Sequence, residues 1–234
     1  MTSTGRNKDP SWPLRTERIA TRIGELRIQV PRDVGRLLTK SSSLLRAAER
    51  FEHPHWAEVW PASVALARAV LRGPSLAGVT VVDLGCGAGL AGVAAARHGA
   101  RVVFADRAPE ALTLADHNAR RNGVLDHEIR AFDWERDDLP ASTRLLLLAD
   151  LCYSWRAVRP LLRQVDMVIG HGGAVLAADP FRPTANDLWR GLIDRGATPS
   201  TLPITLRENR CEVRIAALNP VEDRSHSHGM KGPT

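Results

Sequence analysis

The chain has few cysteines, and none stands in a metal-binding arrangement. Cys86, Cys152 and Cys211 are scattered along 234 residues, and no CxxC pair occurs. A disulfide framework or a structural zinc site would need more cysteines at closer spacing. The sequence therefore predicts reduced thiols and no metal.

Long apolar runs are absent as well. No stretch reaches the roughly 18 uninterrupted apolar residues of a membrane span, and the N-terminal MTSTGRNKDPSWPLR lacks the apolar core of a signal peptide. We therefore expect a cytoplasmic protein with no membrane partner. The net charge is +6, but nearly all basic residues are arginines spread along the chain, so a nucleic-acid partner is not expected.

What the chain does have is apolar sequence for one core, since 44% of its residues are hydrophobic. Residues 1–16 and 219–234 are polar and are expected to be disordered tails. Residues 17–78 are expected to form an N-terminal extension and lid of strand and helix. Residues 79–218 are expected to form the main domain.

The order of apolar segments predicts the fold class. Within the extension, the sequence predicts a strand at 24–30 and a helix at 41–50. From residue 79 onward, strand candidates alternate with helical patterns, which predicts a doubly wound, mostly parallel α/β sheet of seven strands. Near the end, PITLRE and CEVRIAAL are too close for a helix, so they predict an antiparallel hairpin with ENR as its turn. This is the layout of class I methyltransferases, which have a Rossmann-like fold.

A glycine-rich turn follows the first strand of the main domain, in VVDLGCGAGLAG at 81–92. Gly85, Gly87 and Gly89 form G-x-G-x-G, whereas a dinucleotide site has G-x-G-x-x-G and here would need glycine at Leu90. A leucine there argues against the close helix approach of a pyrophosphate site. The pattern resembles motif I of enzymes that use S-adenosylmethionine (SAM).

Acidic and aromatic residues at successive strand ends complete a candidate cofactor site. Asp106 is placed to accept both ribose hydroxyls. Asp133 and Trp134 stand where this fold contacts adenine, although a turn aspartate beside a surface-anchoring tryptophan is the alternative. Asp83 is expected at the mouth of the sheet, near the ammonium of the cofactor's methionine part.

Six segments together resemble the lysine-methyltransferase branch of the seven-β-strand methyltransferases: HPHWAEVWPASVALARAVL at 53–71, DLGCGAGLAG, FAD, NARRNG, DLCY and ADPFR. The likeness is strongest to the electron-transfer-flavoprotein β-subunit lysine methyltransferases, often called nicotinamide N-methyltransferase-like. It spans about residues 24–218. Its most specific parts are WAEVWPASVALA and the tetrapeptide from Asp150 to Tyr153. The resemblance implies a SAM-dependent N-methyltransferase that acts on a protein lysine.

By that resemblance, Trp60 lines the cofactor pocket, and Asp150 and Tyr153 border the channel of the acceptor nitrogen. If their segment is helical, Trp56 and Trp60 lie one turn apart and face the same side, as cofactor wall or as core stripe. A carboxylate raises the pKa of a nearby amine, so we expect Asp150 to orient the acceptor rather than activate it. Tyr153 is expected to contact the lysine or to pack in the core.

Three positions depart from the family pattern, and other functions remain open. Ala108 stands where a second acid is common, Ser154 where an aspartate is frequent, and Phe181 where a small residue is expected. A small-molecule N-methyltransferase, acting on an amine or a heteroaromatic nitrogen, is therefore the main alternative. A nucleic-acid enzyme would often carry Asp/Asn-Pro-Pro-aromatic where this chain has Asp150-Leu-Cys-Tyr. A scaffold without chemistry is disfavoured by the complete set of glycines and strand-end acids.

Overall fold

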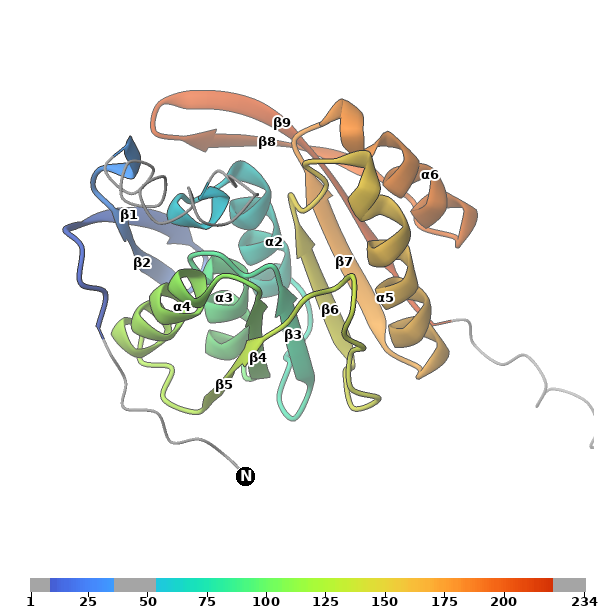
Figure 1. Ribbon diagram of the computed structural model, residues 1–234, viewed down its shortest axis with the longest axis horizontal. Helices are drawn as coiled ribbons and strands as arrows, with labels where there is room; N and C mark the ends of the chain where they lie inside the picture. The colour runs from blue at the N-terminus through green and yellow to red at the C-terminus, as the bar shows by residue number, and fades with distance from the viewer. Residues whose placement is uncertain (1–8, 36–53, 221–234) are drawn as a thin grey trace, which may run out of the picture.

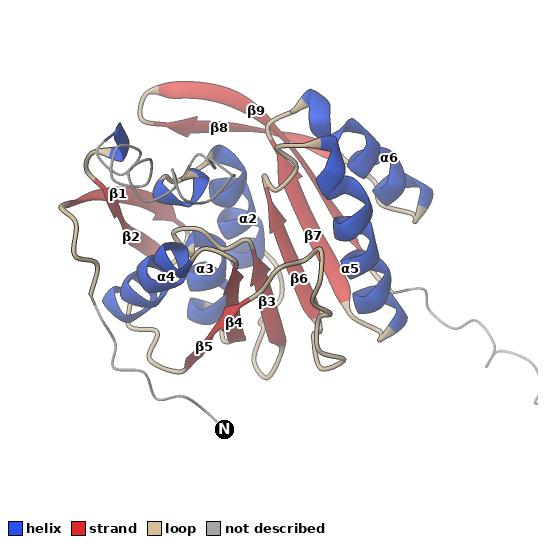
Figure 2. Ribbon diagram, viewed as in Figure 1, coloured by secondary structure: helices blue, strands red, loops and turns tan. Residues whose placement is uncertain are grey.

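The computed structural model describes residues 9–35 and 54–220. Its centre is a seven-stranded sheet with helices on both faces (Figures 1 and 2). The strands are β3 (Thr80–Leu84), β4 (Arg101–Asp106), β5 (His127–Ala131), β6 (Leu145–Ala149), β7 (Ala174–Asp179), β8 (Ser200–Leu206) and β9 (Asn209–Leu218). They lie in the order β5-β4-β3-β6-β7-β9-β8. The first five are parallel, and β9 and β8 are antiparallel, which confirms the predicted fold class.

The helices divide between the two faces of the sheet (Figure 2). One face carries α2 (Pro61–Arg72), α3 (Leu90–Arg97) and α4 (Pro109–Arg121), and the other carries α5 (Val158–Gly170) and α6 (Asn186–Asp194). Side chains of a strand alternate between the faces. Phe104 accordingly packs with the first group of helices and Val103 with the second. Apolar side chains on both faces explain the continuous hydrophobic strands.

A separate hairpin precedes this sheet. It consists of β1 (Leu14–Thr21) and β2 (Gly24–Pro31), paired antiparallel, and β2 confirms the strand predicted at 24–30. The expected tail over 1–16 was placed too far along the chain, because Leu14 to Thr16 already pair with β2. The helix expected at 41–50 lies outside the described residues.

The outer edge of β2 is bound by Asn118 of α4 and by Asn122, the C-cap of that helix. Asn118 and Asn122, one helical turn apart and both buried, each exchange two hydrogen bonds with the backbone of β2. Their Oδ1 atoms accept the N–H groups of Gln29 and Arg27 at 2.7 and 3.0 Å, and their Nδ2 atoms donate to the carbonyls of the same residues at 2.9 Å. The two amides thus replace a neighbouring strand and attach the hairpin to the main domain.

Two expectations about local structure differ from the fold. Trp56 and Trp60 do not lie on one helix: a 3-10 turn, η1 (His55–Ala57), is followed by extended residues, and Trp60 is the N-cap of α2 with φ −101° and ψ 150°. Pro61 forces this break, because it excludes the residue before it from helical geometry, and it begins the helix as expected. The hairpin turn lies at Arg207 and Glu208, one residue earlier than ENR, because both adopt positive φ in a two-residue connection.

Within residues 9–35 and 54–220, no helix is long and apolar enough to cross a membrane.

Candidate active site

The glycine turn between β3 and α3 has a backbone that side chains would not tolerate. Gly85, Gly87 and Gly89 have φ of 59°, 51° and 78°, in the left-handed region that favours glycine. A Cβ on Gly85 would lie 2.5 Å from the side chain of Leu151 and 3.2 Å from the ring of Trp134. The turn therefore lies close to the loop after β6 and to the tryptophan predicted at the adenine site.

Asp106, at the end of β4, is held against this turn. Its Oδ2 accepts the N–H of Gly87 at 3.0 Å, and its Oδ1 accepts the N–H of Ala108 at 2.9 Å. Burial raises the pKa of Asp106, and the two N–H donors oppose that rise. The carboxylate thus lies against the glycine turn, and its contact with the ribose stays a prediction.

Asp83 is more enclosed than the sequence suggested. Asp83 is only 2% exposed, and its Oδ2 accepts the N–H of Gly92 at 2.8 Å. Burial, followed by the charge of Asp106, raises the pKa of Asp83 to about 7. In this structure Asp83 fixes the first turn of α3, and a contact with the cofactor's ammonium stays a prediction.

The predicted adenine contacts differ in what they do. Trp134 is half-buried and lies against the glycine turn at Gly85. The Oδ1 of Asp133 accepts the N–H of Glu135 at 3.0 Å, which is the geometry of a turn aspartate. Trp134 thus lies beside the glycine turn and Asp133 closes its own turn, and a contact of either residue with adenine stays a prediction.

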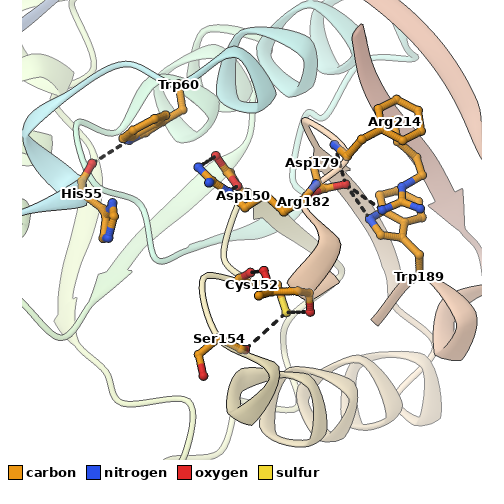
Figure 3. A network of polar contacts seen from close by, with 11 residues as sticks. His55, Trp60, Asp150, Cys152, Ser154, Asp179, Arg182, Trp189 and Arg214 are labelled. Carbon is orange, nitrogen blue, oxygen red and sulfur yellow. Dashed lines mark hydrogen bonds and ion pairs between the residues drawn. The ribbon is translucent and has the colours of Figure 1, made fainter. Parts of the chain in front are cut away.

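The predicted acceptor residue Asp150 follows β6 in a left-handed conformation with φ 56°. Its N–H donates to the carbonyl of Ala178 at 2.9 Å, and the residue is 2% exposed. Arg182 donates two hydrogen bonds to the carboxylate, one from Nε to Oδ1 and one from Nη2 to Oδ2. The distance from Nη2 to Oδ2 is 2.8 Å. Figure 3 shows the guanidinium lying against Asp150, close to Trp60.

Aromatic rings flank the same guanidinium. The Cζ of Arg182 lies 5.5 Å from the ring centroid of Trp60 and 5.1 Å from that of Tyr153, within cation–π range. His55 stacks on Tyr153 with centroids 4.0 Å apart, and its carbonyl accepts the indole N–H of Trp60 at 2.7 Å. We call Asp150, Trp60 and Tyr153 the cation cage.

The sequence predicted Asp150 and Tyr153 at the acceptor channel and Trp60 at the cofactor pocket, but it predicted neither Arg182 nor His55. Both stand in segments that carried the resemblance, ADPFR and HPHW. Their contacts arise from loops that only the fold brings together, so spacing gave no signal for them. The Trp56 side chain packs elsewhere, with its ring centroid 5.7 Å from that of Trp12.

The backbone that carries Arg182 is fixed by Asp179, at the end of β7. Its two oxygens accept the N–H groups of Phe181 and Arg182 at 3.0 and 2.9 Å. Oδ1 also accepts from Trp189 Nε1 at 3.1 Å and Arg214 Nη2 at 2.9 Å (Figure 3). Phe181 has φ 60° and is 45% exposed, and its ring centroid lies 5.0 Å from the Cζ of Arg214.

Burial and the ion pair between Asp150 and Arg182 shift the pKa values in the cage. Burial raises the pKa of Asp150, and the donors of Arg182 oppose the rise, while the same carboxylate raises the pKa of Arg182. Burial and the charge of Asp150 also raise the pKa of Tyr153, so its phenol keeps its proton. A buried carboxylate needs a charged partner, and in this structure Arg182 is that partner.

No group of three or more potential metal ligands comes together in the described part of the chain.

Comparisons with known proteins show the family and the fold. A family model described as lysine methyltransferase matches residues 39–192, which is more than half of the chain. The electron transfer flavoprotein beta subunit lysine methyltransferase of Danio rerio is 35% identical over 146 residues, 58% of this chain and 54% of that protein. The ribosomal protein L11 methyltransferase of Aeromonas hydrophila is 39% identical over 113 residues, 48% of this chain and 36% of that protein. The chain thus matches about half or less of the length of these relatives.

A solved structure shares the fold. The N-methyltransferase NodS from Bradyrhizobium japonicum, in complex with S-adenosyl-L-homocysteine, superposes with a TM-score of 0.56 at 16% identity. The match covers 77% of this chain and 98% of NodS. At this identity the likeness concerns the fold, which is that of SAM-dependent methyltransferases.

Proposed function

Because the chain belongs to the lysine methyltransferase family, we propose that it transfers the methyl group of SAM to a lysine side chain of a protein. One observation carries the choice of acceptor. The cage of Asp150, Trp60 and Tyr153 holds a cation between a carboxylate and two rings, beside the loop that contacts the glycine turn. A protonated lysine is a cation that these groups bind well.

The cofactor side of the proposal uses the glycine turn and its neighbours. Gly85, Gly87 and Gly89 clear space for the methionine part, and Asp106 binds the ribose hydroxyls through its remaining lone pairs. Trp134 covers the adenine, with Asp133 near its amine, and Trp60 borders the pocket. In this proposal the core over 79–218 supplies most of the site, and Trp60 brings the predicted extension over 17–78 to its border.

The reaction is a direct displacement. The lone pair of the amine attacks the methyl carbon as the carbon–sulfur bond breaks, and S-adenosylhomocysteine leaves. A lysine with a reference pKa of about 10.4 must first lose a proton, which costs about 4 to 5 kcal/mol at neutral pH. Asp150 binds and orients the ammonium, whereas desolvation and the cationic sulfonium lower its pKa.

Labelling tests the proposal. The purified protein and its Asp150→Asn variant are incubated with radiolabelled SAM and a fractionated cell extract, and label in protein is separated from label in small molecules. We expect a labelled protein band that the variant does not produce, with mass spectrometry locating the methyl group on lysine. The matched control, Asp187→Asn, removes an exposed carboxylate that pairs with Arg190 and should label as the wild type does.

Two results would contradict the proposal. Label confined to small molecules would replace the protein lysine by a small amine or a heteroaromatic nitrogen. SAM binding in calorimetry without label in either fraction would favour a scaffold without chemistry.

A cytoplasmic location stays a prediction, consistent with three free cysteines.

A further inference from the structure

The guanidinium of Arg182 has the position and the partners that an incoming lysine would need. It binds both oxygens of Asp150 and lies within 5.5 Å of two ring centroids. Each of these three groups also attracts an alkylammonium ion. The side chain of Asp150 is 1% exposed and that of Arg182 is 29% exposed, so the arginine lies between the carboxylate and solvent.

We propose that Arg182 is an internal occupant of the acceptor site, and that the substrate's ammonium displaces it from the cation cage. This inference rests on the proposed function and specifies its acceptor as a cationic amine. Asp150 is buried, and a buried charge without a partner is strongly unfavourable. The cage therefore exchanges one cation for another and excludes a neutral heteroaromatic nitrogen.

The backbone geometry allows this exchange. The turn that carries Arg182 is fixed through backbone N–H groups on Asp179, and those bonds do not involve the guanidinium. The Arg182 side chain can thus leave Asp150 without breaking the turn. What it gives up are contacts with the carboxylate and the two rings, which the incoming ammonium would make in turn.

A second arginine shows what a structural ion pair looks like in this region. The Arg214 side chain is 15% exposed, bonds to Asp179, and lies 4.4 Å above the ring of Trp189 and 5.0 Å from that of Phe181. It bridges β9 to the end of β7 from within the fold. Arg182 instead comes from a loop and is the more exposed of the two.

Titration with n-butylamine, which is protonated at pH 7, tests the exchange without SAM or turnover. Binding is followed by tryptophan fluorescence, because Trp60 belongs to the cage, with n-butanol as the neutral probe. An occupant that fills the site nine-tenths of the time lowers apparent affinity roughly tenfold. We therefore expect Arg182→Ala to bind the amine at least about tenfold more tightly than the wild type, and n-butanol to show no such gain.

Three further variants make the result specific. Arg182→Ala/Asp150→Asn should lose the gained binding, and Arg182→Lys should restore competition. Arg195→Ala removes an arginine from a distant exposed pair with Asp166 and should behave as the wild type. Circular dichroism confirms folding, and Arg182→Gln takes the place of Arg182→Ala if that variant does not fold.

Two outcomes would overturn the inference: equal amine binding by the wild type and Arg182→Ala, or no binding by either folded protein. Arg182 would then be a structural residue that links the loops after β6 and β7. A gain that persists in the double variant would also overturn it. Since the titration needs no methyl transfer, its failure leaves the labelling result standing. Absence of labelling likewise leaves the titration result standing.

Discussion

The buried carboxyl of Asp83 should make stability fall as pH rises toward neutrality. Its pKa is raised from the ordinary 3.8 to about 7, first by burial and then by the charge of Asp106, against the N–H of Gly92. The folded state therefore holds this proton more tightly than the unfolded state. The contribution to stability is fully present below about pH 4 and is lost as pH rises to about 7. The complete loss corresponds to about 4 kcal/mol.

Replacing Asp83 by asparagine removes the charge and keeps an oxygen that can accept the N–H of Gly92. The free energy of unfolding of Asp83→Asn, relative to the wild type, should increase from pH 5 to pH 8 by about 2.5 kcal/mol. Urea unfolding at pH 5, 6, 7 and 8, at constant ionic strength and without cofactor, measures this difference. Glu135→Gln makes the same charge change on an exposed side chain and is the matched control.

The reasoning would be refuted by a difference between Asp83→Asn and wild type that stays constant within about 0.5 kcal/mol across this range. A difference that shrinks with rising pH would refute it more strongly, because the ionised carboxylate would then stabilise the fold. If Glu135→Gln reproduced the effect, net charge rather than burial would be its cause.

Three more outcomes are expected. Gly85→Ala should lower the free energy of unfolding, measured in urea, by about 3 kcal/mol, because of left-handed strain and the contact with Leu151. Gly172 has φ 74° and open space around it, so Gly172→Ala should show the strain alone, about 1 kcal/mol. Equal losses in the two variants would contradict this account. Asn118→Ala should destabilise the fold by about 3 kcal/mol, because the partly buried backbone N–H and carbonyl of Gln29 lose their partner; a loss below about 0.5 kcal/mol would show that the hairpin does not depend on Asn118. EDTA should not change the rate of methyl transfer, since the displacement needs no metal; inhibition reversed by added metal would contradict this.

The main sheet could be predicted because its physical signal is local. Apolar runs such as LLLL at 145–148 are buried on both faces, and parallel strands with crossover helices produce that pattern. The glycine turn was also readable, since left-handed backbone and close approach require glycine at Gly85. These features depend on residues within one short segment.

Contacts between segments that are distant in the chain could not be predicted from the sequence in the same way. The amides of Asn118 and Asn122 bind β2, about ninety residues away in the chain. The local sequence NARRNG contains no signal that predicts this partner. Arg182 reaches Asp150 across 32 positions. Even the burial of Asp83 depends on Phe104 and Gly92 closing around it. Side-chain partners of this kind follow from the fold rather than from spacing.

The strand-end aspartates differ in the partners of their carboxylates, and this difference bears on function. Asp83 and Asp106 accept backbone N–H groups that fix α3 and the glycine turn. Asp179 accepts two backbone N–H groups and fixes the next loop. The carboxylate of Asp150 instead accepts its hydrogen bonds from the side chain of Arg182. A backbone donor cannot be exchanged without unfolding a turn, whereas a side chain can rotate away, so Asp150 is the acid whose partner a substrate can replace.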